Sequence, residues 1–360
     1  MNPQITVLEG DGIGPEVIAE AVKVLKAVEK RFGHTFELDY GDIGAVAIDR
    51  KGHPFPEETL SKCLSSDAIL FGTIGDPRYD DDPGAKMRPE QGLLAMRKAL
   101  GLYANVRPIR SYPMLEEFSP LKKSVIQGVD FVVYRELTGG IYFGERGRND
   151  AFNAAYDTLI YTYEEIKRIA QQAFRAAMKR KYHVTLVDKA NVLESSRLWR
   201  EVVKQTAMAY PEVKLDFMFV DNAAMQIMTN PAQFDVILTG NMFGDILTDE
   251  ASVITGSLGM LPSASIGANH DLYEPIHGSY PKAAGKSIAN PMATILSLAM
   301  MLEYSFEMIE ESQAIKKAID NTLDEGIVTR DLNRDAYYKT HEVGDAVAQN
   351  ILQLQPEQKF

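Results

Sequence analysis

Short apolar runs alternate with segments of helical periodicity along much of the chain. Apolar runs of strand length occupy residues 5–8, 68–72, 124–127, 130–134, 184–188, 217–221 and 234–239. Apolar residues recur at helical spacing over 17–28, 163–179 and 195–209, and the pattern from residue 293 onward is mostly helical. This alternation predicts an α/β protein whose sheets are covered by helices.

The first predicted strand leads into a glycine-rich turn, Gly10-Asp11-Gly12-Ile13-Gly14-Pro15. Phosphate-binding loops lie at such a passage from strand to helix. The dinucleotide fingerprint of the Rossmann fold requires glycine at position 15, and Pro15 breaks it. Proline suits the first turn of a helix, so the motif alone predicts a tight turn rather than a Rossmann fold.

Composition and charge restrict the class of partner. The 360 residues include 38 Lys and Arg against 50 Asp and Glu, a net charge of −12. This length predicts two domains, and the lack of a basic run argues against nucleic acid or an anionic membrane as partner. The single cysteine cannot form an internal disulfide, no signal peptide is apparent, and the most apolar stretch, 291–302, is too short to cross a bilayer. We therefore expect a cytoplasmic protein.

Three acidic residues are candidate metal ligands. Asp245 and Asp249 are four residues apart, so on a helix they share one face and repel each other. A divalent cation between them would remove that conflict, and a set of oxygen ligands favours Mg²⁺ or Mn²⁺. Asp221, at the end of a predicted strand, could complete the site. For the two acids alone, a solvated acidic helix explains the pattern equally well.

Several other side chains are candidates for binding or proton transfer. Arg97, Arg107 and Arg135 could hold a dicarboxylate, although each alone is more simply a structural ion pair. Lys189 follows the strand 184–188, where α/β active sites form, and could act as a base. Tyr142 is either a packed strand residue or a proton donor. His277 lacks a companion at zinc-ligand spacing and alone is a loop histidine.

The order of five motifs carries a family resemblance. They are Gly10-Asp-Gly-Ile-Gly-Pro-Glu, Arg135-Glu-Leu-Thr-Gly-Gly-Ile-Tyr-Phe-Gly, Asp188-Lys-Ala-Asn-Val, Gly244-Asp-Ile-Leu-Thr-Asp and Glu274-Pro-Ile-His-Gly-Ser. The chain resembles the isocitrate/isopropylmalate dehydrogenase family of β-decarboxylating dehydrogenases, from Gly10 nearly to the C-terminus. Within that family it is most similar to the isopropylmalate branch.

The resemblance implies a two-domain α/β fold without a Rossmann unit and with the active site in the cleft between the domains. Residues 1–102 plus 255–360 would form a discontinuous cofactor-binding domain. Residues 103–254 would form the substrate, metal and dimerisation domain. The family forms homodimers with shared active sites, so Lys189 and Asp221 would enter the cleft of the partner copy.

The resemblance also implies a reaction, the oxidative decarboxylation of 3-isopropylmalate to 4-methyl-2-oxopentanoate, a leucine precursor, with reduction of NAD. Arg97, Arg107 and Arg135 would bind the substrate carboxylates, and Asp221, Asp245 and Asp249 would hold Mg²⁺ or Mn²⁺ beside the substrate. Lys189 would take the hydroxyl proton, and Tyr142 would protonate the enol carbon. The expected NAD-binding residues are Ile13, Glu274, His277, Gly278, Ser279, Lys282 and Asn290.

Substrate choice within the family depends on the segment 90–97. Isocitrate relatives place serine and asparagine six and four residues before the arginine that corresponds to Arg97, where this chain has Gln91 and Leu93. Leu93 and Leu94, beside Glu90 and with Val192 from the partner copy, suit an isopropyl group, because a carboxylate buried there would lack donors. D-malate, tartrate and homoisocitrate dehydrogenases are the alternatives. A catalytically silent binding protein of the same fold is the alternative from another class.

The chain departs from the common family pattern at Lys282. Many NAD-using relatives have an aspartate there, which binds the ribose hydroxyls and repels a 2′-phosphate. NADP-using isocitrate relatives have a lysine followed by tyrosine, whereas here Ala283 follows Lys282. We therefore expect NAD as the cofactor, with weak discrimination against NADP. The alternative is that Lys282 points to solvent.

Overall fold

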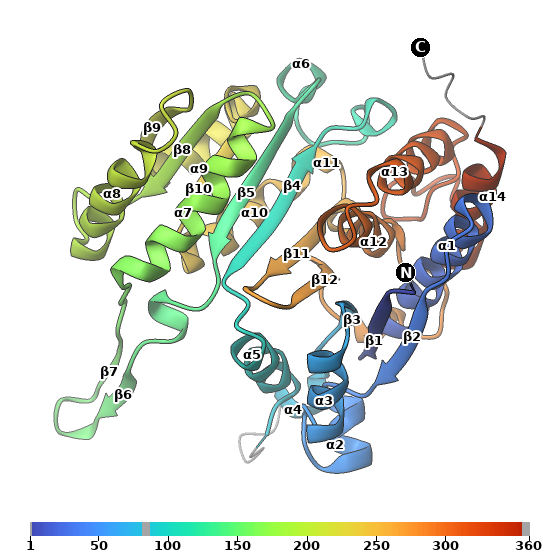
Figure 1. The fold of residues 1–360 in the computed structure, drawn as a ribbon, viewed down its shortest axis with the longest axis horizontal. Coiled ribbons are helices and arrows are strands. Elements are labelled where there is room, and N and C mark those ends of the chain that lie inside the picture. The colour runs from blue at the N-terminus through green and yellow to red at the C-terminus, as the bar shows by residue number, and fades with distance from the viewer. Residues whose placement is uncertain (1, 81–86, 355–360) are drawn as a thin grey trace. The chain divides into compact units, whose positions relative to one another are not determined.

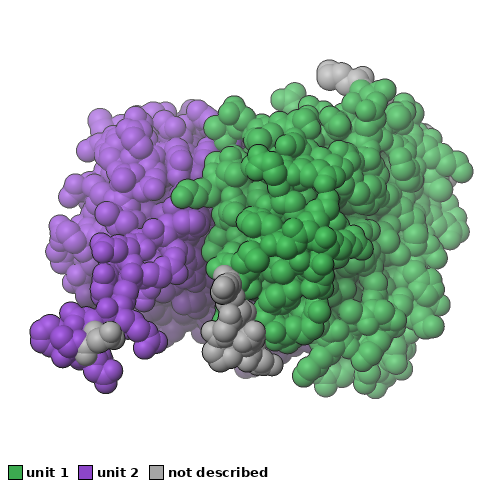
Figure 2. All heavy atoms as spheres, turned by 90° about the horizontal axis from the view of Figure 1, so that it is seen from below, with its two compact units in different colours: residues 1–101, 256–264, 268–360 green, residues 102–255, 265–267 purple. Residues whose placement is uncertain are grey.

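The computed structural model describes residues 2–80 and 87–354. These residues form two compact units, shown in different colours in Figure 2. Unit 1 contains residues up to Gly101, Gly256–Ala264 and the chain from Ala268 onward, and unit 2 contains Leu102–Thr255 with Ser265–Gly267. Both units are α/β, as the alternating pattern predicts.

Unit 1 is built on a sheet with the strand order β2-β1-β3-β12-β11. The strands are β1 (Gln4–Gly10), β2 (Glu37–Gly41), β3 (Ala68–Thr73), β11 (Pro262–Ile266) and β12 (Asp271–Pro275). β1 pairs in parallel with β2 and β3, and β3 in parallel with β12. Every residue of β3 is buried, as expected for the centre of a covered parallel sheet.

The helices of unit 1 bring together segments from the N-terminal and C-terminal parts of the described chain. They are α1 (Gly14–Phe32), α2 (Ala45–Lys51), α3 (Glu57–Ser65), α4 (Pro77–Asp80), α5 (Pro89–Ala99), α12 (Met292–Tyr304), α13 (Ile309–Asp324) and α14 (Thr340–Gln353), with short 3-10 turns η5 (Leu258–Met260) and η6 (Pro281–Ala283). α1 packs against α14, where Arg31 donates to the carbonyl of Ile351 (Figure 1). The apolar helix α12 is buried from Met292 to Leu302 and packs against α13. Among the described residues, none of the helices has the length and apolarity needed to cross a membrane.

The strands of unit 2 have the order β4-β5-β10-β8-β9. The strands are β4 (Ala104–Arg110), β5 (Asp130–Glu136), β8 (His183–Asp188), β9 (Lys214–Phe219) and β10 (Val236–Thr239). β4 runs antiparallel to β5, whereas β5, β10, β8 and β9 pair in parallel. A separate antiparallel hairpin joins β6 (Arg146–Asn149) to β7 (Ala154–Asp157) (Figure 1).

The helices of unit 2 follow its strands. They are α6 (Lys123–Ile126), α7 (Tyr163–Met178), α8 (Glu194–Ala207), α9 (Val220–Thr229), α10 (Asn241–Glu250) and α11 (Ser252–Thr255), with 3-10 turns η1 (Pro113–Leu115), η2 (Gly140–Tyr142), η3 (Asp150–Phe152) and η4 (Pro231–Gln233). α7 begins with a capping box in which Thr162 and Glu165 each accept a hydrogen bond from the other's backbone N–H.

Two local predictions for unit 2 are wrong. The run 124–127 is not a strand but lies largely in the single-turn helix α6, where only Ile126 is buried, and Gly128 follows at φ +71°. Asp221 is in the first turn of α9 rather than at the end of a strand. For Tyr142, the alternative of a packed strand residue is excluded, because it ends the 3-10 turn η2.

Candidate active site

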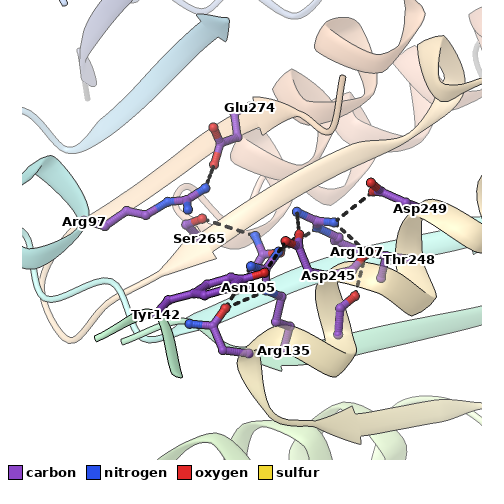
Figure 3. A network of polar contacts seen from close by, with 12 residues as sticks. Arg97, Asn105, Arg107, Arg135, Tyr142, Asp245, Thr248, Asp249, Ser265 and Glu274 are labelled. Carbon is purple, nitrogen blue, oxygen red and sulfur yellow. Dashed lines mark hydrogen bonds and ion pairs between the residues drawn. The ribbon is translucent and has the colours of Figure 1, made fainter. Parts of the chain in front are cut away.

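Two acids of α10 face two arginines of the unit 2 sheet. Arg135 forms an ion pair with Asp245 (Figure 3). Arg107 reaches both acids, with Nη2 3.9 Å from Oδ1 of Asp245 and Nη1 3.8 Å from Oδ1 of Asp249. Partial burial raises the pKa of Asp249; Arg107 opposes this rise and the charge of Asp245 adds to it. The predicted pair of neighbouring carboxylates is therefore present, and both carboxylates form ion pairs with arginine side chains.

The two arginines are held in place by their strands and by neighbouring amides. Arg107 on β4 and Arg135 on β5 are both buried. Oδ1 of Asn105 accepts from Nε of Arg107 at 2.7 Å, and Oδ1 of Asn241 accepts from Nε and Nη2 of Arg135 at 3.0 and 2.8 Å. A Cβ on Gly244 would lie 2.7 Å from Cγ of Arg135, so α10 approaches this side chain as closely as only glycine permits.

Sequence reasoning missed Asn105, Asn241 and Thr248. Oγ1 of Thr248 accepts from Nη1 of Arg107 and donates to the carbonyl of Gly244. Asn241 and Thr248 stand within or next to the motif around Asp245. Their spacing from Asp245 puts a polar side chain on each helical turn, and this was the signal in the sequence that could have identified them. Asn105 stands two residues before Arg107 on the same strand, so both side chains lie on the same face of the sheet.

Tyr142 completes this cluster. Its hydroxyl donates to Oδ2 of Asp245 at 3.1 Å, and the Arg135 guanidinium lies 6.0 Å from the centre of its ring. Burial raises the pKa of Tyr142, and the carboxylate of Asp245 raises it further. The hydroxyl therefore keeps its proton at neutral pH and can donate it.

Lys189 and Asp221 form a second group within unit 2. Nζ of Lys189 lies 2.5 Å from Oδ1 of Asp221, and this pairing lowers the pKa of Asp221. Backbone N–H groups of Val192 and Leu193 bond to the carbonyl of Lys189, and the side chain of Val192 is exposed. Across residues 2–80 and 87–354 no three acidic, histidine or cysteine residues cluster as metal ligands, so Asp221 does not join Asp245 and Asp249 in one copy.

In unit 1, α5 presents the predicted specificity residues. Glu90, Leu93, Leu94 and Arg97 follow the spacing i, i+3, i+4, i+7, so they share one helix face. Nη2 of Arg97 donates to Oε1 of Glu274 at 3.0 Å, and both side chains are largely buried. Nε of Arg97 is also buried and has no partner within the described part of the chain. One N–H group of the Arg97 guanidinium is therefore left without a hydrogen bond in the described residues.

Apart from Glu274 on β12, the predicted cofactor residues of unit 1 come from two segments that contact each other, one around Ile13 and the other from His277 to Asn290. The N–H of Ile13 donates to the carbonyl of Ser279 at 2.8 Å, and a Cβ on Gly12 would lie 2.0 Å from that oxygen. Tyr280 adopts φ +37° directly before η6, which leaves Lys282 exposed. Glycine at position 12 thus permits the close approach of the loops.

Two polar side chains between β12 and α12 differ in their hydrogen bonding. Nδ2 of Asn290 donates to Asp331 at 3.1 Å, and its Oδ1 accepts from the N–H of Met292. Nδ1 of His277 lies 3.1 Å from the carbonyl of Gly278, but its Nε2 is buried without a partner in the described residues. Burial lowers the pKa of His277, so the ring is neutral at pH 7. An unsatisfied ring nitrogen of this kind fits a ligand with polar groups, such as a dinucleotide.

Comparison with known proteins gives one consistent family. A family model described as isocitrate/isopropylmalate dehydrogenase matches residues 4–347. The 3-isopropylmalate dehydrogenase of Bacteroides fragilis is 53% identical over 96% of this chain and 97% of its own, and that of Geobacillus kaustophilus is 57% identical over 92% and 90%.

Solved structures agree with the sequence comparison. The isocitrate dehydrogenase of Methylococcus capsulatus superposes with a TM-score of 0.88 at 34% identity, covering 98% of this chain and all of its own. A β-decarboxylating dehydrogenase of Thermococcus kodakarensis has a TM-score of 0.81 at 36% identity, over 98% and 96% of the two chains. These likenesses span nearly the whole chain.

Proposed function

This chain belongs to the isocitrate/isopropylmalate dehydrogenase family, and we propose that it oxidises and decarboxylates 3-isopropylmalate to 4-methyl-2-oxopentanoate, with reduction of NAD, in leucine biosynthesis. The cluster of Arg107, Arg135, Tyr142, Asp245 and Asp249 carries this proposal. It joins two buried cations, two acids and a proton-bearing phenol within hydrogen-bonding or ion-pairing reach. The hydroxyl of Tyr142 is on a partly exposed side chain beside Asp245, so a bound substrate could reach it.

The arginines are the proposed ligands of the substrate carboxylates. A guanidinium binds a carboxylate through two parallel N–H groups, and buried arginines do so with little competition from water. In the structure Arg107 and Arg135 pair with acids of α10, and Arg97 pairs with Glu274. We propose that the substrate carboxylates take up part of these contacts when they bind.

The choice of an isopropyl group rests on α5. Leu93 and Leu94 lie on the same helix face as Arg97 and offer apolar surface where a carboxylate would find no donors. Leu94 is 40% exposed, so burial against a substrate methyl group would stabilise the complex. We assign Glu90 and the partner copy's counterpart of the exposed Val192 to the rim of this surface.

Asp245 and Asp249 fit a divalent cation, because their oxygens are hard ligands and the charge of Asp245 adds to the rise that burial causes in the pKa of Asp249. When bound, Mg²⁺ or Mn²⁺ supplies a Lewis acid that lowers the pKa of the C2 hydroxyl of the substrate. We propose Asp221 of a second copy as the third acid. A homodimer with shared sites would then supply what one copy does not bring together.

Two side chains are proposed to move protons. Lys189, in its neutral form, takes the proton of the C2 hydroxyl while the C2 hydride leaves, and like Asp221 it would act in the site of the partner copy. Tyr142 holds its proton through burial and the nearby Asp245, and donates it to C3 after CO₂ has left. Oxidation at C2 is what makes the acid a β-keto acid that can lose CO₂.

Unit 1 is the proposed cofactor-binding unit. When bound, NAD supplies the acceptor for the hydride. Ile13, Gly278, Ser279 and Asn290 lie on the two contacting loops, and Nε2 of His277 is a buried polar atom available to the ligand. Glu274, whose position is fixed by its ion pair with Arg97, would orient the nicotinamide end of NAD. The exposed Lys282 weakens discrimination against NADP, because its cation attracts a 2′-phosphate.

A side-by-side reduction assay tests the proposed function. NADH absorbance is followed with 3-isopropylmalate, isocitrate and D-malate, each with Mg²⁺ and with excess EDTA. We expect kcat/KM to be highest for isopropylmalate and activity to disappear in EDTA. Preference for D-malate or isocitrate would assign the chain to a sibling activity. Absence of turnover with all three acids would favour a silent binding protein.

A further inference from the structure

Unit 2 buries an acid that the proposed reaction does not use. Glu136 ends β5, directly after Arg135, and its side chain is fully buried. A carboxylate is costly to bury unless donors surround it. We propose that Glu136 is a positioning residue, which fixes the turn between β5 and η2 and thereby sets the position of Tyr142. The inference rests on the proposed function, in which Tyr142 protonates C3 of the substrate.

Among the described residues, four donors contact the Glu136 carboxylate. Oε2 accepts from the N–H groups of Thr138 at 3.0 Å and Gly139 at 2.6 Å. Oε1 accepts from the hydroxyl of Thr138 at 2.8 Å and from Nη2 of Arg168 at 3.2 Å. Burial raises the pKa of Glu136, and the hydrogen bonds from Gly139 and Thr138 oppose that rise. One carboxylate oxygen thus holds two successive N–H groups of the turn.

The turn continues into Tyr142 without slack. Gly140 has φ +80°, and a Cβ there would lie 2.3 Å from the hydroxyl oxygen of Tyr161, so this step of the turn requires glycine. Tyr142 ends η2, with its hydroxyl 3.1 Å from Oδ2 of Asp245 (Figure 3). Only two residues separate Gly139 from Tyr142, so a shift of the turn would displace the phenol.

The same turn is also tied to α10. The carbonyl of Gly139 accepts from Nδ2 of Asn241 at 3.1 Å, and Asn241 is the first residue of α10, which carries Asp245. Glu136 therefore holds Gly139 by its N–H, and Asn241 holds it by its carbonyl. Together these two contacts set the place of Tyr142 relative to Asp245.

The position of Tyr142 determines which face of the intermediate is protonated. Loss of CO₂ breaks the bond from C3 to its carboxyl carbon, and the electron pair forms the C2=C3 bond of an enolate. C3 then takes the hydroxyl proton of Tyr142 from one side, the C2 carbonyl re-forms, and the phenol recovers a proton from water. In D₂O one deuterium therefore enters C3 in one configuration, whereas a displaced phenol lets water deliver it from either side.

The configuration at C3 tests the role of Glu136. Turnover in D₂O is coupled to ammonia and leucine dehydrogenase, which use the NADH of the first reaction to trap the product as leucine, and proton NMR distinguishes the two configurations. The native enzyme should give one of them. Glu136→Gln should approach equal amounts, with kcat lowered roughly 10–100-fold and KM within about threefold, because a small misplacement impairs the transfer and not the binding.

Asp235→Asn is the matched control. Asp235 is also buried in unit 2 and accepts from two backbone N–H groups and a guanidinium, those of Lys181, His183 and Arg180. It precedes β10, however, at the opposite end of that strand from Asn241. Asp235→Asn should lower the melting temperature, as Glu136→Gln does, and keep one configuration. An unchanged ratio in Glu136→Gln, or equal loss of selectivity in both variants, would overturn the inference.

A measurement that needs no turnover separates this inference from the proposed function. With ¹³C at the ζ carbon of every tyrosine, the Tyr142 resonance is the one missing from Tyr142→Phe. Glu136→Gln should shift or split it, and Asp235→Asn should not. Should Glu136→Gln fail to fold, Glu136→Asp, whose carboxylate is one methylene shorter, takes its place. A Tyr142 resonance that does not move overturns the inference, whereas a native protein inactive on isopropylmalate overturns the proposed function and leaves this comparison to decide the role of Glu136.

Discussion

The two units stabilise their functional side chains in different ways. In unit 2 the functional side chains form one network, so each charge is balanced by a neighbouring side chain. Its members are Arg107, Arg135, Asp245, Asp249 and Tyr142. In unit 1, by contrast, loops held by backbone contacts position the candidate residues, and Nε2 of His277 is left without a partner within the described residues.

This difference predicts different consequences of mutation. Removing one member of a buried charge network leaves another charge uncompensated, so substitutions in unit 2 should impair the reaction itself. Substitutions on the face of α5 or on the cofactor loops of unit 1 should instead change which molecule binds. The following predictions test this contrast, from the largest expected effect to the smallest.

Asp245→Asn should lower kcat most. The change keeps the shape of the side chain but removes a charge proposed to hold the cation, whose effect on the transition state is worth several kcal/mol, or roughly 10²–10³-fold in rate. Steady-state assays at saturating Mg²⁺ measure this loss, and melting curves check the fold. Glu250→Gln on the same helix is the control and should retain near-normal kcat. Near-normal activity of Asp245→Asn at low Mg²⁺ would contradict the proposed metal site.

Mixed copies test whether unit 2 shares its site with a partner. Asp221→Asn and Asp245→Asn should each be nearly inactive alone. Co-expressed in equal amounts, they should recover about a quarter of the native activity, because half of the dimers are mixed and each mixed dimer has one intact site of two. Different affinity tags allow the mixed dimers to be isolated. Mixed dimers as inactive as the single variants would show that Asp221 serves its own copy.

Leu93→Asn tests whether unit 1 sets substrate choice. Losing a few buried methyl contacts costs about 1–3 kcal/mol, so kcat/KM for isopropylmalate should fall 10–200-fold relative to D-malate. Ala95→Asn is the control, since that residue is exposed and is not part of the i, i+3, i+4, i+7 face. An unchanged ratio in Leu93→Asn would place the isopropyl group elsewhere.

Lys282→Asp tests cofactor choice. A charged hydrogen bond to a 2′-phosphate is worth about 1.5–3 kcal/mol, so the ratio of kcat/KM for NADP over NAD should fall roughly 10–100-fold. Lys286→Asp, a neighbouring exposed lysine, is the control. A strong native preference for NAD that neither substitution alters would mean that Lys282 points to solvent and has no part in cofactor choice.

The pH dependence of NAD binding should show the smallest effect. Burial lowers the pKa of His277, so the ring takes up its proton at a lower pH than an exposed histidine, which titrates near 6.5. KM for NAD in the native enzyme should therefore follow that of His277→Gln as pH falls from 8 to about 6.5 and depart from it only at lower pH. A step near pH 6.5 that His277→Gln abolishes would contradict the buried, neutral assignment.

Predictions that rest on local spacing agree with the structure. Pro15 lies in the first turn of α1, where its fixed φ is favourable, and Asp245 and Asp249 share a face of α10 because they are about one helical turn apart. Residues 124–127 were predicted incorrectly because a short apolar run does not by itself distinguish a strand from a buried turn. The roles in cofactor, metal and substrate binding stay predictions.

Periodicity and motif order predicted the α/β class, the family and the residue types able to carry the chemistry, because these patterns are properties of neighbouring residues. Tertiary structure decided which of those residues meet. The antiparallel pairing of β4 and β5 places Asn105 opposite Arg135, with Arg107 two residues further along β4, and Asn241 reaches Arg135 across 106 residues of chain. Likewise, β8 and β10 lie side by side although they are far apart in sequence. Such contacts depend on strand order and packing between distant segments, which no local pattern encodes.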